Sequence, residues 1–598
     1  MRNYKKQHYE LFFLILILAG AFILRLWGVN FGLPGLFHLD ERIFPVDAFY
    51  RLSHKGQIPF VHHSYPYGDL IPNMLAVFYG IYYLILKLIK IVHTPFDFLV
   101  FYIRNPSSVY LIGRMLFVLS STASVFVLYL IGKRLCNKTV GFLSAFFLAF
   151  NFLSVQQAKF MKGDTLGTLL MLISVYFCFP QKDEEDVNGQ IKHKKYILTG
   201  IFAGLAIAAR FTLVVYLIVP VIVFLMDKKI LFANKIKNCL IFILCSISTF
   251  LILTPSVIFR CYIFFINMLS LGIQVGEASK SINSNSAWMI HMDNGIGIPL
   301  AIIGILGMLY SLYKKENISL IVFVVLFGSA VFNLATPSWH AIAIIPFIVF
   351  FAAKFIYEIS IIICKKKPKT RHFFLAVVSI LVVIPPLLNV LKYNYLISCP
   401  DTRNLAKEFI EKTIPPGSKI VSEGMEYFEQ TSILGVPINK SKKQLQEQFD
   451  KVKKEGFGGA LVLAEIKGQK EPSYTLENIL ILEDPPYKNE KYDTTVEIYL
   501  EHNIDYLIMS SWVRDCSWNY SKYIMPEKFA ISLEKEYEII KEFKPNPVFD
   551  WDYYCFSKID YNALSKVAIW HRKIIGGPII KIYKKRISPL PICQTDRK

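Results

Sequence analysis

Long runs of uncharged, apolar residues recur along the chain, and they constrain its fold more than any other feature. Four such runs are residues 11–24, 240–258, 320–335 and 373–390. Runs approaching 20 residues are long enough to cross a bilayer as α-helices. The chain has 598 residues, of which 54% are hydrophobic and only 19% charged, which excludes a disordered chain and a soluble domain of this size. We therefore predict a polytopic α-helical membrane protein.

The net charge of +21 does not indicate a nucleic-acid-binding protein. Much of the charge lies in short loops between apolar runs, which is the pattern of the positive-inside rule, whereas nucleic-acid binding requires a basic face on a folded domain. The N-terminal sequence MRNYKK is basic, and no small-residue cleavage site follows the first apolar run. This run is predicted to be a retained first helix rather than a signal peptide.

The hydropathy pattern predicts about eleven spans. A further apolar stretch, 71–91, is predicted to be interfacial or re-entrant, because counting it as a span would move every strongly basic short loop to the outside. The predicted spans are 10–28, 109–132, 139–158, 164–180, 196–210, 212–228, 238–258, 296–313, 318–335, 339–362 and 372–392.

This span count fixes the expected orientation. The N-terminus is predicted to be cytoplasmic, in a plasma (inner) membrane. Residues 29–108 then form one long extracytoplasmic loop, and the odd number of spans places the C-terminal region outside as well. We expect two domains: a transmembrane domain over 1–395 and an extracytoplasmic α/β domain over 396–598.

The composition of that C-terminal region indicates alternating helices and strands. An amphipathic helix with Asp401 as its N-cap should be followed by a Pro-Pro-Gly turn and a strand. The apolar stretches ALVLAE (460–465), ILILED (479–484) and IDYLIMSS (504–511) are further strand candidates. The region contains four cysteines, whose three pairings the sequence does not distinguish and which could equally be free thiols: Cys399, Cys516, Cys555 and Cys593.

Two adjacent acids, Asp40 and Glu41, directly follow the first span in the segment FHLDE. Most acidic pairs in loops are simply solvated. A carboxylate close to the low-dielectric boundary, however, is costly unless it has a partner or a chemical task. We therefore keep both residues as catalytic candidates.

A second polar segment, QQAKFMKGDTL, lies in a predicted tight outer turn and contains Lys159, Lys162 and Asp164. Asp164 could cap the following helix, a role in which Asp is common. The turn is nevertheless expected on the same side of the membrane as Asp40, so all three residues are candidates for the site.

Isolated charges within the spans add further candidates. Arg210 interrupts an otherwise uncharged run, and an intramembrane arginine is usually functional, although it could also extend its head group toward the outer surface. Arg114, near the outer end of its span, is a weaker case of the same kind. His340 begins a span on the outer face, where a single histidine is more often structural.

Carboxylates and cations on one side of a membrane suit one kind of chemistry. A carboxylate can act as general base toward an acceptor hydroxyl, and cations can stabilise a departing phosphate. The chain contains neither a Walker motif nor a Gly-rich nucleotide loop nor a Cys/His zinc spacing. A nucleotide cofactor is therefore not expected, and a lipid-linked phosphate donor fits better; whether a divalent metal ion takes part stays open.

Taken together, these segments resemble the C-type (GT-C) membrane glycosyltransferases, in particular the bacterial branch related to protein O-mannosyltransferases and aminoarabinose transferases. FHLDE is similar to that family's H-x-D-E motif, and HHSYPYGDL, which contains Tyr65, to its juxtamembrane segment. AKFMKGDTL resembles the second acidic motif. Arg210 stands where the family usually has lysine, and Trp339 precedes His340 where an arginine is usual.

The resemblance implies a polyprenyl-phosphate sugar donor and transfer to a protein, lipid or glycan acceptor on the outer face of the bilayer. Asp40 would be the base, and Glu41 and Asp164 would orient it, bind a metal or hold the acceptor. A transporter or lipid flippase of envelope glycan assembly is the alternative, and a non-catalytic assembly factor is another. The candidate donor-binding residues are Lys159, Lys162, Arg210, Arg114, His340 and Tyr65.

Overall fold

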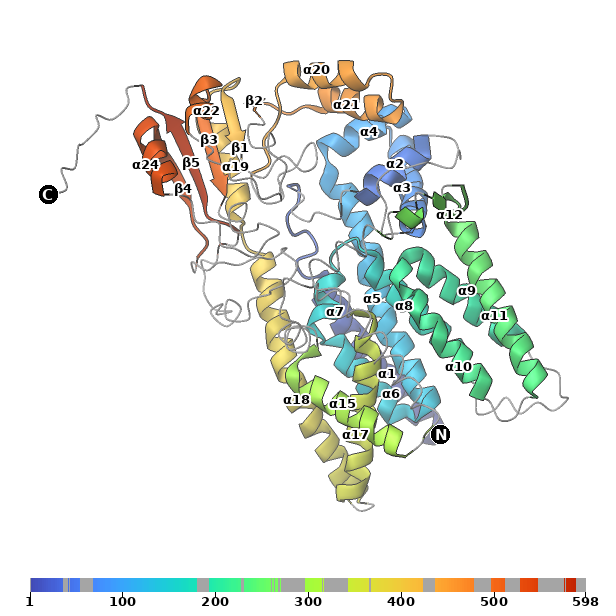
Figure 1. Cartoon of the computed structure of the whole chain (residues 1–598). Coiled ribbons are helices and arrows are strands. Elements are labelled where there is room, and N and C mark those ends of the chain that lie inside the picture. The colour runs from blue at the N-terminus through green and yellow to red at the C-terminus, as the bar shows by residue number, and fades with distance from the viewer. Residues whose placement is uncertain are drawn as a thin grey trace. The chain divides into compact units, whose positions relative to one another are not determined.

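A computed structural model describes most of the chain, and it divides the chain into two compact units (Figure 1). The first unit comprises residues 1–29, 43–80 and 110–394, and the second comprises 30–42, 81–109 and 395–598. The described residues are 2–35, 41, 43–53, 68–179, 193–226, 231–259, 261–262, 264–266, 269, 296–314, 316, 342–364, 367–422, 436–477, 496–510, 527–546, 575 and 577–587.

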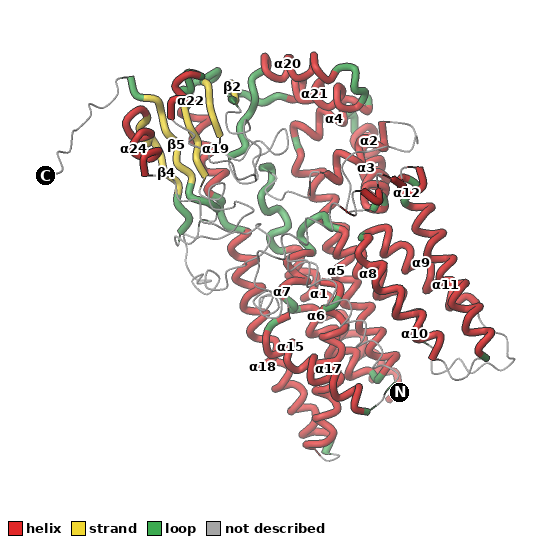
Figure 2. Tube along the Cα trace, in the orientation of Figure 1, coloured by secondary structure: helices red, strands yellow, loops and turns green. Residues whose placement is uncertain are grey.

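The first unit is built from helices (Figure 2). Its helices form over long apolar stretches of the sequence, and the last of them contains the Pro385–Pro386 pair in its interior. In chain order, the helices that contribute to this unit are α1 (Arg2–Leu26), α2 (Ile43–Ser53), α3 (Leu70–Leu88), α5 (Pro106–Leu135), α6 (Lys138–Ala149), α7 (Phe152–Gln157), α8 (Gly163–Cys178), α9 (His193–Ala209), the 3₁₀ helix η2 (Phe211–Leu217), α10 (Ile218–Met226), α11 (Phe232–Leu253), α12 (Ser256–Phe259), α15 (Ile298–Tyr313), α17 (Ile345–Cys364) and α18 (Pro368–Ile397).

The expectation of a multi-pass membrane protein is confirmed. Among the described residues, six helices are long and apolar enough to cross a membrane. Several of the other predicted spans correspond to shorter apolar helices, and the predicted span 318–335 lies outside the described residues, so the count of eleven stays a prediction. The six long helices are His8–Leu26, Leu70–Leu88, Pro106–Leu135, Phe232–Leu253, Ile345–Cys364 and Pro368–Ile397.

Most of the stretch predicted to be interfacial or re-entrant, 71–91, lies in one helix, α3, which ends at Leu88. It has 19 residues, so its length and composition permit a crossing. Large apolar side chains such as Val77, Leu84 and Leu88 are exposed on it, as expected of a helix in contact with lipid. The predicted orientation of the chain therefore depends on the positions of the basic loops and not on the length of this helix.

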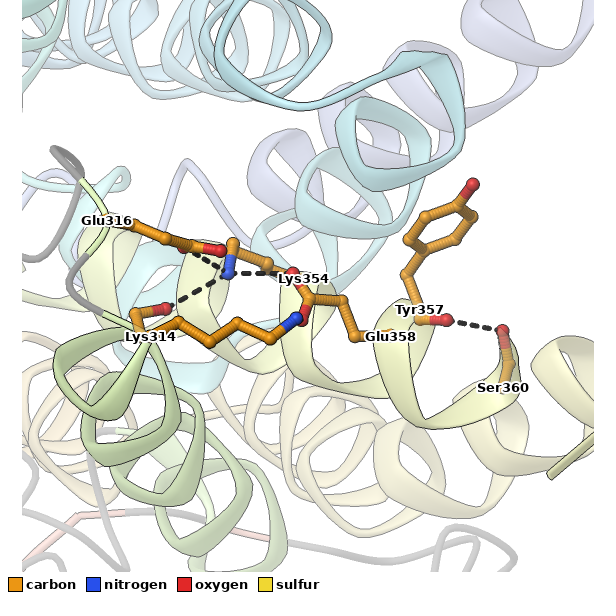
Figure 3. Close-up of polar contacts among 7 residues, drawn as sticks. Lys314, Glu316, Lys354, Tyr357, Glu358 and Ser360 are labelled. Carbon is orange, nitrogen blue, oxygen red and sulfur yellow. Dashed lines mark hydrogen bonds and ion pairs between the residues drawn. The ribbon is translucent and has the colours of Figure 1, made fainter. Parts of the chain in front are cut away.

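Close helix packing defines the core of the first unit. Helix α9 packs against α8 on one side and α11 on the other, and α17 packs against α6 and α15. A buried lysine, Lys354 of α17, reinforces the contact between α17 and α15 (Figure 3). Its ammonium lies 2.6 Å from Glu316 Oε2 and 2.8 Å from Glu358 Oε1, and Lys314 lies 2.8 Å from the other oxygen of Glu358. The cluster balances two cations with two carboxylates, so burial leaves no unpaired charge.

The second unit contains a five-stranded mixed sheet with the strand order β2-β1-β3-β5-β4. Strand β1 pairs in parallel with β2 and β3, whereas β5 pairs antiparallel with β3 and β4. Apolar residues alternate along the strands and form one cluster with helix α19 and another with helices α22 and α24. The elements are α4 (Pro95–Arg104), α19 (Thr402–Thr413), β1 (Lys419–Ser422), α20 (Lys442–Val452), α21 (Phe457–Gly468), β2 (Thr475–Leu476), α22 (Val496–Glu501), β3 (Tyr506–Ser510), α24 (Glu527–Glu536), β4 (Tyr537–Phe543) and β5 (Ile580–Lys585).

Some predictions for this region are confirmed and one is wrong. Asp401 caps α19 by accepting from the amide of Arg403, and the strands predicted after the Pro-Pro-Gly turn and at 504–511 are β1 and β3. The segment 460–465, predicted as a strand, belongs to helix α21, because its Ala and Leu residues favour a helix and α21 packs on α4 and α20.

The segment 479–484 lies outside the described residues. Cys399 is a free thiol, and Cys516, Cys555 and Cys593 also lie outside the described residues.

Candidate functional site

Two sequence-predicted residues, Asp164 and Arg210, form a buried ion pair in the first unit. Arg210 Nε lies 3.2 Å from Asp164 Oδ1, and the two side chains are only 3% and 4% exposed. Asp164 is in the first turn of α8, and Arg210 is the residue between α9 and η2. A turn and a helix break that are 46 residues apart in the sequence are thus joined at one point.

Two glycines on α8 allow this close approach. Gly163 and Gly167 are four residues apart and therefore lie on one face of the helix. A Cβ at Gly163 would overlap the carbonyl oxygen of Ala209, and a Cβ at Gly167 would lie 2.6 Å from Leu213 Cδ1 and 3.5 Å from Arg210 Cβ. Small residues at such a face let helix backbones approach closely in membrane proteins. The sequence around Asp164 therefore places Arg210 beside it.

The structure excludes the alternative roles of these two residues, a helix cap for Asp164 and a side chain extended to the surface for Arg210. The N-cap of α8 is Lys162, and its side chain makes no capping hydrogen bond, so Asp164 is not the helix cap. An acid in the first turn still interacts favourably with the helix dipole. The side chain of Arg210 is buried against Asp164 and does not extend to the surface.

The surroundings of the pair are polar and shielded from solvent. Lys162, two residues before Asp164, is fully buried. Asp164 Oδ2 has no hydrogen-bond partner among the described residues, and the same is true of Gln157 Oε1. The hydroxyl of Thr165 donates to the carbonyl oxygen of Gln157 at 3.2 Å, which keeps this glutamine beside the start of α8.

Lys159 has a different environment from that expected of a phosphate ligand. Its ammonium donates to three carbonyl oxygens at the end of α1: Leu24 at 2.8 Å, Arg25 at 3.1 Å and Trp27 at 2.7 Å. Burial lowers the pKa of Lys159, and the charge of Arg25 lowers it further. Three carbonyl acceptors oppose this by stabilising the protonated form.

Of the remaining predicted site residues, two are buried and three lie outside the described residues. Arg114 is buried and donates to the carbonyl oxygen of Val29 at 2.7 Å. Glu41 belongs to the second unit and is fully buried. Asp40, Tyr65 and His340 lie outside the described residues, so their predicted roles stay predictions.

The described part of the chain offers no group of three or more His, Cys, Asp and Glu side chains that could hold a metal ion. The carboxylate of Asp164 is paired with a guanidinium instead.

One comparison with known proteins bears directly on this site. Residues 98–259 match the family model of dolichyl-phosphate-mannose-protein mannosyltransferases. The matched segment contains Arg114, Lys159, Lys162, Asp164 and Arg210. The resemblance to C-type membrane glycosyltransferases, predicted from the motifs, is thereby confirmed over the segment that holds the buried ion pair.

Other comparisons give weaker similarities. The chain matches none of the curated proteins with which it was compared. A structure of the Archaeoglobus fulgidus oligosaccharyltransferase, tethered to an acceptor peptide with an NVT sequon, aligns with a TM-score of 0.49 at 10% identity, over 98% of this chain and 89% of that one. The apo form of the same enzyme aligns with a TM-score of 0.48 at 11% identity, over 93% and 75% of the two chains. These scores are too low to assign a function.

A second polar cluster in the first unit was not predicted from the sequence. Asp69 accepts from Arg51 Nη2 at 2.8 Å and from the hydroxyl of Ser256 at 2.6 Å. Arg51 Nη1 also donates to Asn73 Oδ1 at 2.6 Å. These contacts join α2, the start of α3 and α12. The one sequence signal for it is the Gly68–Asp69 pair at the end of the segment HHSYPYGDL.

Asp47 of α2 completes this cluster and predicts a pH effect. Burial raises its pKa from 3.8 to about 7; Arg51 opposes the shift, and Asp69 adds to it. Between about pH 4 and pH 7 the folded state then binds more protons than the unfolded state, so the free energy of unfolding falls as pH rises through this window. Asp47→Asn removes the ionisation and should stabilise the protein at pH 8 by at most about 4 kcal/mol, with little gain at pH 4.

This prediction is checked by thermal unfolding of the detergent-solubilised protein and the Asp47→Asn variant at several pH values. A variant that gains equally at pH 4 and pH 8, or loses stability at pH 8, would contradict it. Asp97→Asn is a matched control: this carboxylate is exposed, and hydrogen bonds from Thr94 lower its pKa, so its replacement should bring no gain at pH 8.

Proposed function

We propose that the chain is an integral-membrane glycosyltransferase that moves a sugar from a polyprenyl-phosphate donor to an acceptor on the extracytoplasmic face. The observation that carries this proposal is the buried Asp164–Arg210 pair, with the buried Lys162 two residues before Asp164, within the segment that matches the mannosyltransferase family. Two cations and one carboxylate in a site without solvent suit an anionic ligand such as a lipid phosphate.

In the proposed reaction, an acceptor oxygen attacks the anomeric carbon of the donor sugar. Asp40 takes the acceptor proton, and the bond between the anomeric carbon and the phosphate oxygen breaks. Polyprenyl phosphate leaves with the electron pair of that bond, so no general acid is required. Direct displacement inverts the anomeric centre.

Arg210 and Lys162 would stabilise the charge that grows on the leaving phosphate. Asp164 would hold the Arg210 guanidinium in place through Oδ1 and present Oδ2 to a hydroxyl of the donor or acceptor. Glu41 would orient the base or the acceptor. The low dielectric around the pair makes each of these interactions stronger than it would be in water.

The family match supports a finer assignment of the substrates. The donor would carry a hexose or pentose on a dolichyl- or other polyprenyl-phosphate, and a protein is the acceptor that the family description favours. Tyr65 and His340 would line the donor side of the site. The proposed location is the plasma membrane, with a cytoplasmic N-terminus and the second unit's sheet outside.

A transfer assay tests the function. The purified protein in nanodiscs is given polyprenyl-phosphate mannose and a hydroxyl-containing acceptor peptide, and release of polyprenyl phosphate is measured together with the glycosylated peptide. Coupled release of both products supports the proposal. Tight donor binding without either product would instead favour the flippase or the assembly-factor alternative.

The proposed orientation predicts which residues are accessible from outside. A single cysteine at position 442, in a chain whose ten native cysteines are replaced by serine, should react with an impermeant thiol reagent on intact cells. A cysteine at position 367 should react only after the cells are permeabilised, because it lies in a strongly basic loop. Labelling of position 367 on intact cells would overturn the orientation.

A further inference from the structure

The C-terminal end of α1 is closed by side chains from other parts of the first unit. The last carbonyl groups of a helix have no donor within it and must accept hydrogen bonds from elsewhere. Two of them, Ile23 and Leu26, accept from the amides of Trp27 and Val29 in the following turn. The carbonyls of Leu24 and Arg25 accept from the ammonium of Lys159 instead.

Lys159 also donates to Trp27, so its three protons are matched by three carbonyl oxygens. A cation at the C-terminal end of a helix is favoured by the helix dipole. The residue is 1% exposed, so the contacts are made without solvent. A phosphate could attract this ammonium only by drawing it away from the carbonyls of α1.

Two further side chains complete the same closure. Asn394 of α18 donates to the carbonyl oxygen of Leu24 at 2.7 Å, and Arg114 of α5 donates to that of Val29 at 2.7 Å. Lys159, Asn394 and Arg114 therefore hold the end of α1 from three different elements. We call these three residues the α1 collar.

A side chain of α1 in turn holds α7, the helix that precedes Lys159. Arg25 of α1 is fully buried and donates to the hydroxyl of Ser154 in α7 at 2.9 Å and to the carbonyl oxygen of Ala149 at 3.0 Å. On the other side, Met161 packs so closely on α5 that a Cβ at Gly113 would overlap its sulfur. The turn from Lys159 to Lys162 is thus held against both α1 and α5.

We propose that Lys159 is a positioning residue: through the α1 collar it holds the turn that carries Lys162 and Asp164 against the end of α1, and it does not bind the donor phosphate. This inference rests on the proposed function, because the positioned residues are those assigned to the donor. Arg114 and Asn394 act in the same way.

The test separates donor affinity from turnover. Lys159→Met keeps a linear side chain of similar length but has no protons to donate. The dissociation constant for polyprenyl phosphate, measured with the variant in nanodiscs, should rise by a smaller factor than turnover falls, because Arg210 lies outside the turn that Lys159 holds. Turnover of polyprenyl-phosphate mannose should fall by about ten- to a hundredfold, because a displacement near 1 Å of catalytic groups can cost that much. Lys159→Arg, which can still donate to the carbonyls, should recover part of the turnover.

Asn394→Ala supplies an independent comparison, because an uncharged residue has no electrostatic reason to bind phosphate. It should show the same pattern with a smaller effect: turnover falls by a larger factor than affinity does. A tenfold loss of polyprenyl phosphate affinity in Lys159→Met, with normal affinity and turnover in Asn394→Ala, would overturn the inference. If the parent protein neither binds polyprenyl phosphate nor turns over the donor, the proposed function fails instead.

Discussion

Asp40→Asn should reduce turnover by about 10²–10⁴-fold, the usual contribution of a positioned general base, while polyprenyl phosphate still binds. In the proposed reaction the acceptor comes from the aqueous side and the lipid donor stays in the bilayer, so the reacting atoms would meet at the boundary just beyond the first span. A base at that place must be ionised, as an Asp with its ordinary pKa of about 4 is at neutral pH. The amide is nearly isosteric with the carboxylate but cannot take a proton.

The measurement is the release of polyprenyl phosphate from polyprenyl-phosphate mannose by purified, folded variants. Glu41→Gln is the matched control, because it changes the neighbouring carboxylate in the same way. It should reduce turnover less than Asp40→Asn does if Glu41 only orients the base or the acceptor. Near-normal turnover in Asp40→Asn would remove the catalytic assignment and favour the flippase or the assembly-factor alternative.

The sequence predicts features that depend on local patterns. Apolar length predicts five of the six long helices as spans, whereas Leu70–Leu88 was predicted to be interfacial or re-entrant, and the N-cap Asp401 predicts the start of α19. The isolation of Arg210 in an apolar run and the motif around Asp164 identify both members of the buried pair before their contact is known. Each of these signals lies within one segment of the chain.

Features that depend on contacts between distant segments are harder to predict. A lysine in a family motif does not reveal that its protons go to the carbonyls of α1, more than 130 residues earlier. The segment ALVLAE has the apolar character of a buried strand, and only packing on α4 and α20 shows that it is a helix. The Arg51–Asp69–Ser256 cluster likewise joins residues that no single motif contains.

The buried pair gives the other large expected effect. Arg210→Ala should weaken binding of polyprenyl phosphate by tenfold or more, by loss of a charge-assisted contact of roughly 1.5–3 kcal/mol. It should also destabilise the fold by about 3–5 kcal/mol, because it leaves the Asp164 carboxylate buried and unpaired. Arg210→Lys keeps the charge and should bind the phosphate partially, without the planar geometry of the guanidinium.

A double variant separates these two effects. Asp164→Asn combined with Arg210→Gln buries no unpaired charge, so most of the lost stability should return. Donor binding should not return, because the cation is still absent. Thermal unfolding and polyprenyl phosphate binding, measured on the same nanodisc preparations, test both points. If the double variant binds polyprenyl phosphate as tightly as the parent protein does, Arg210 is not a phosphate ligand; if it is no more stable than Arg210→Ala, the unpaired carboxylate is not what destabilises the single variant.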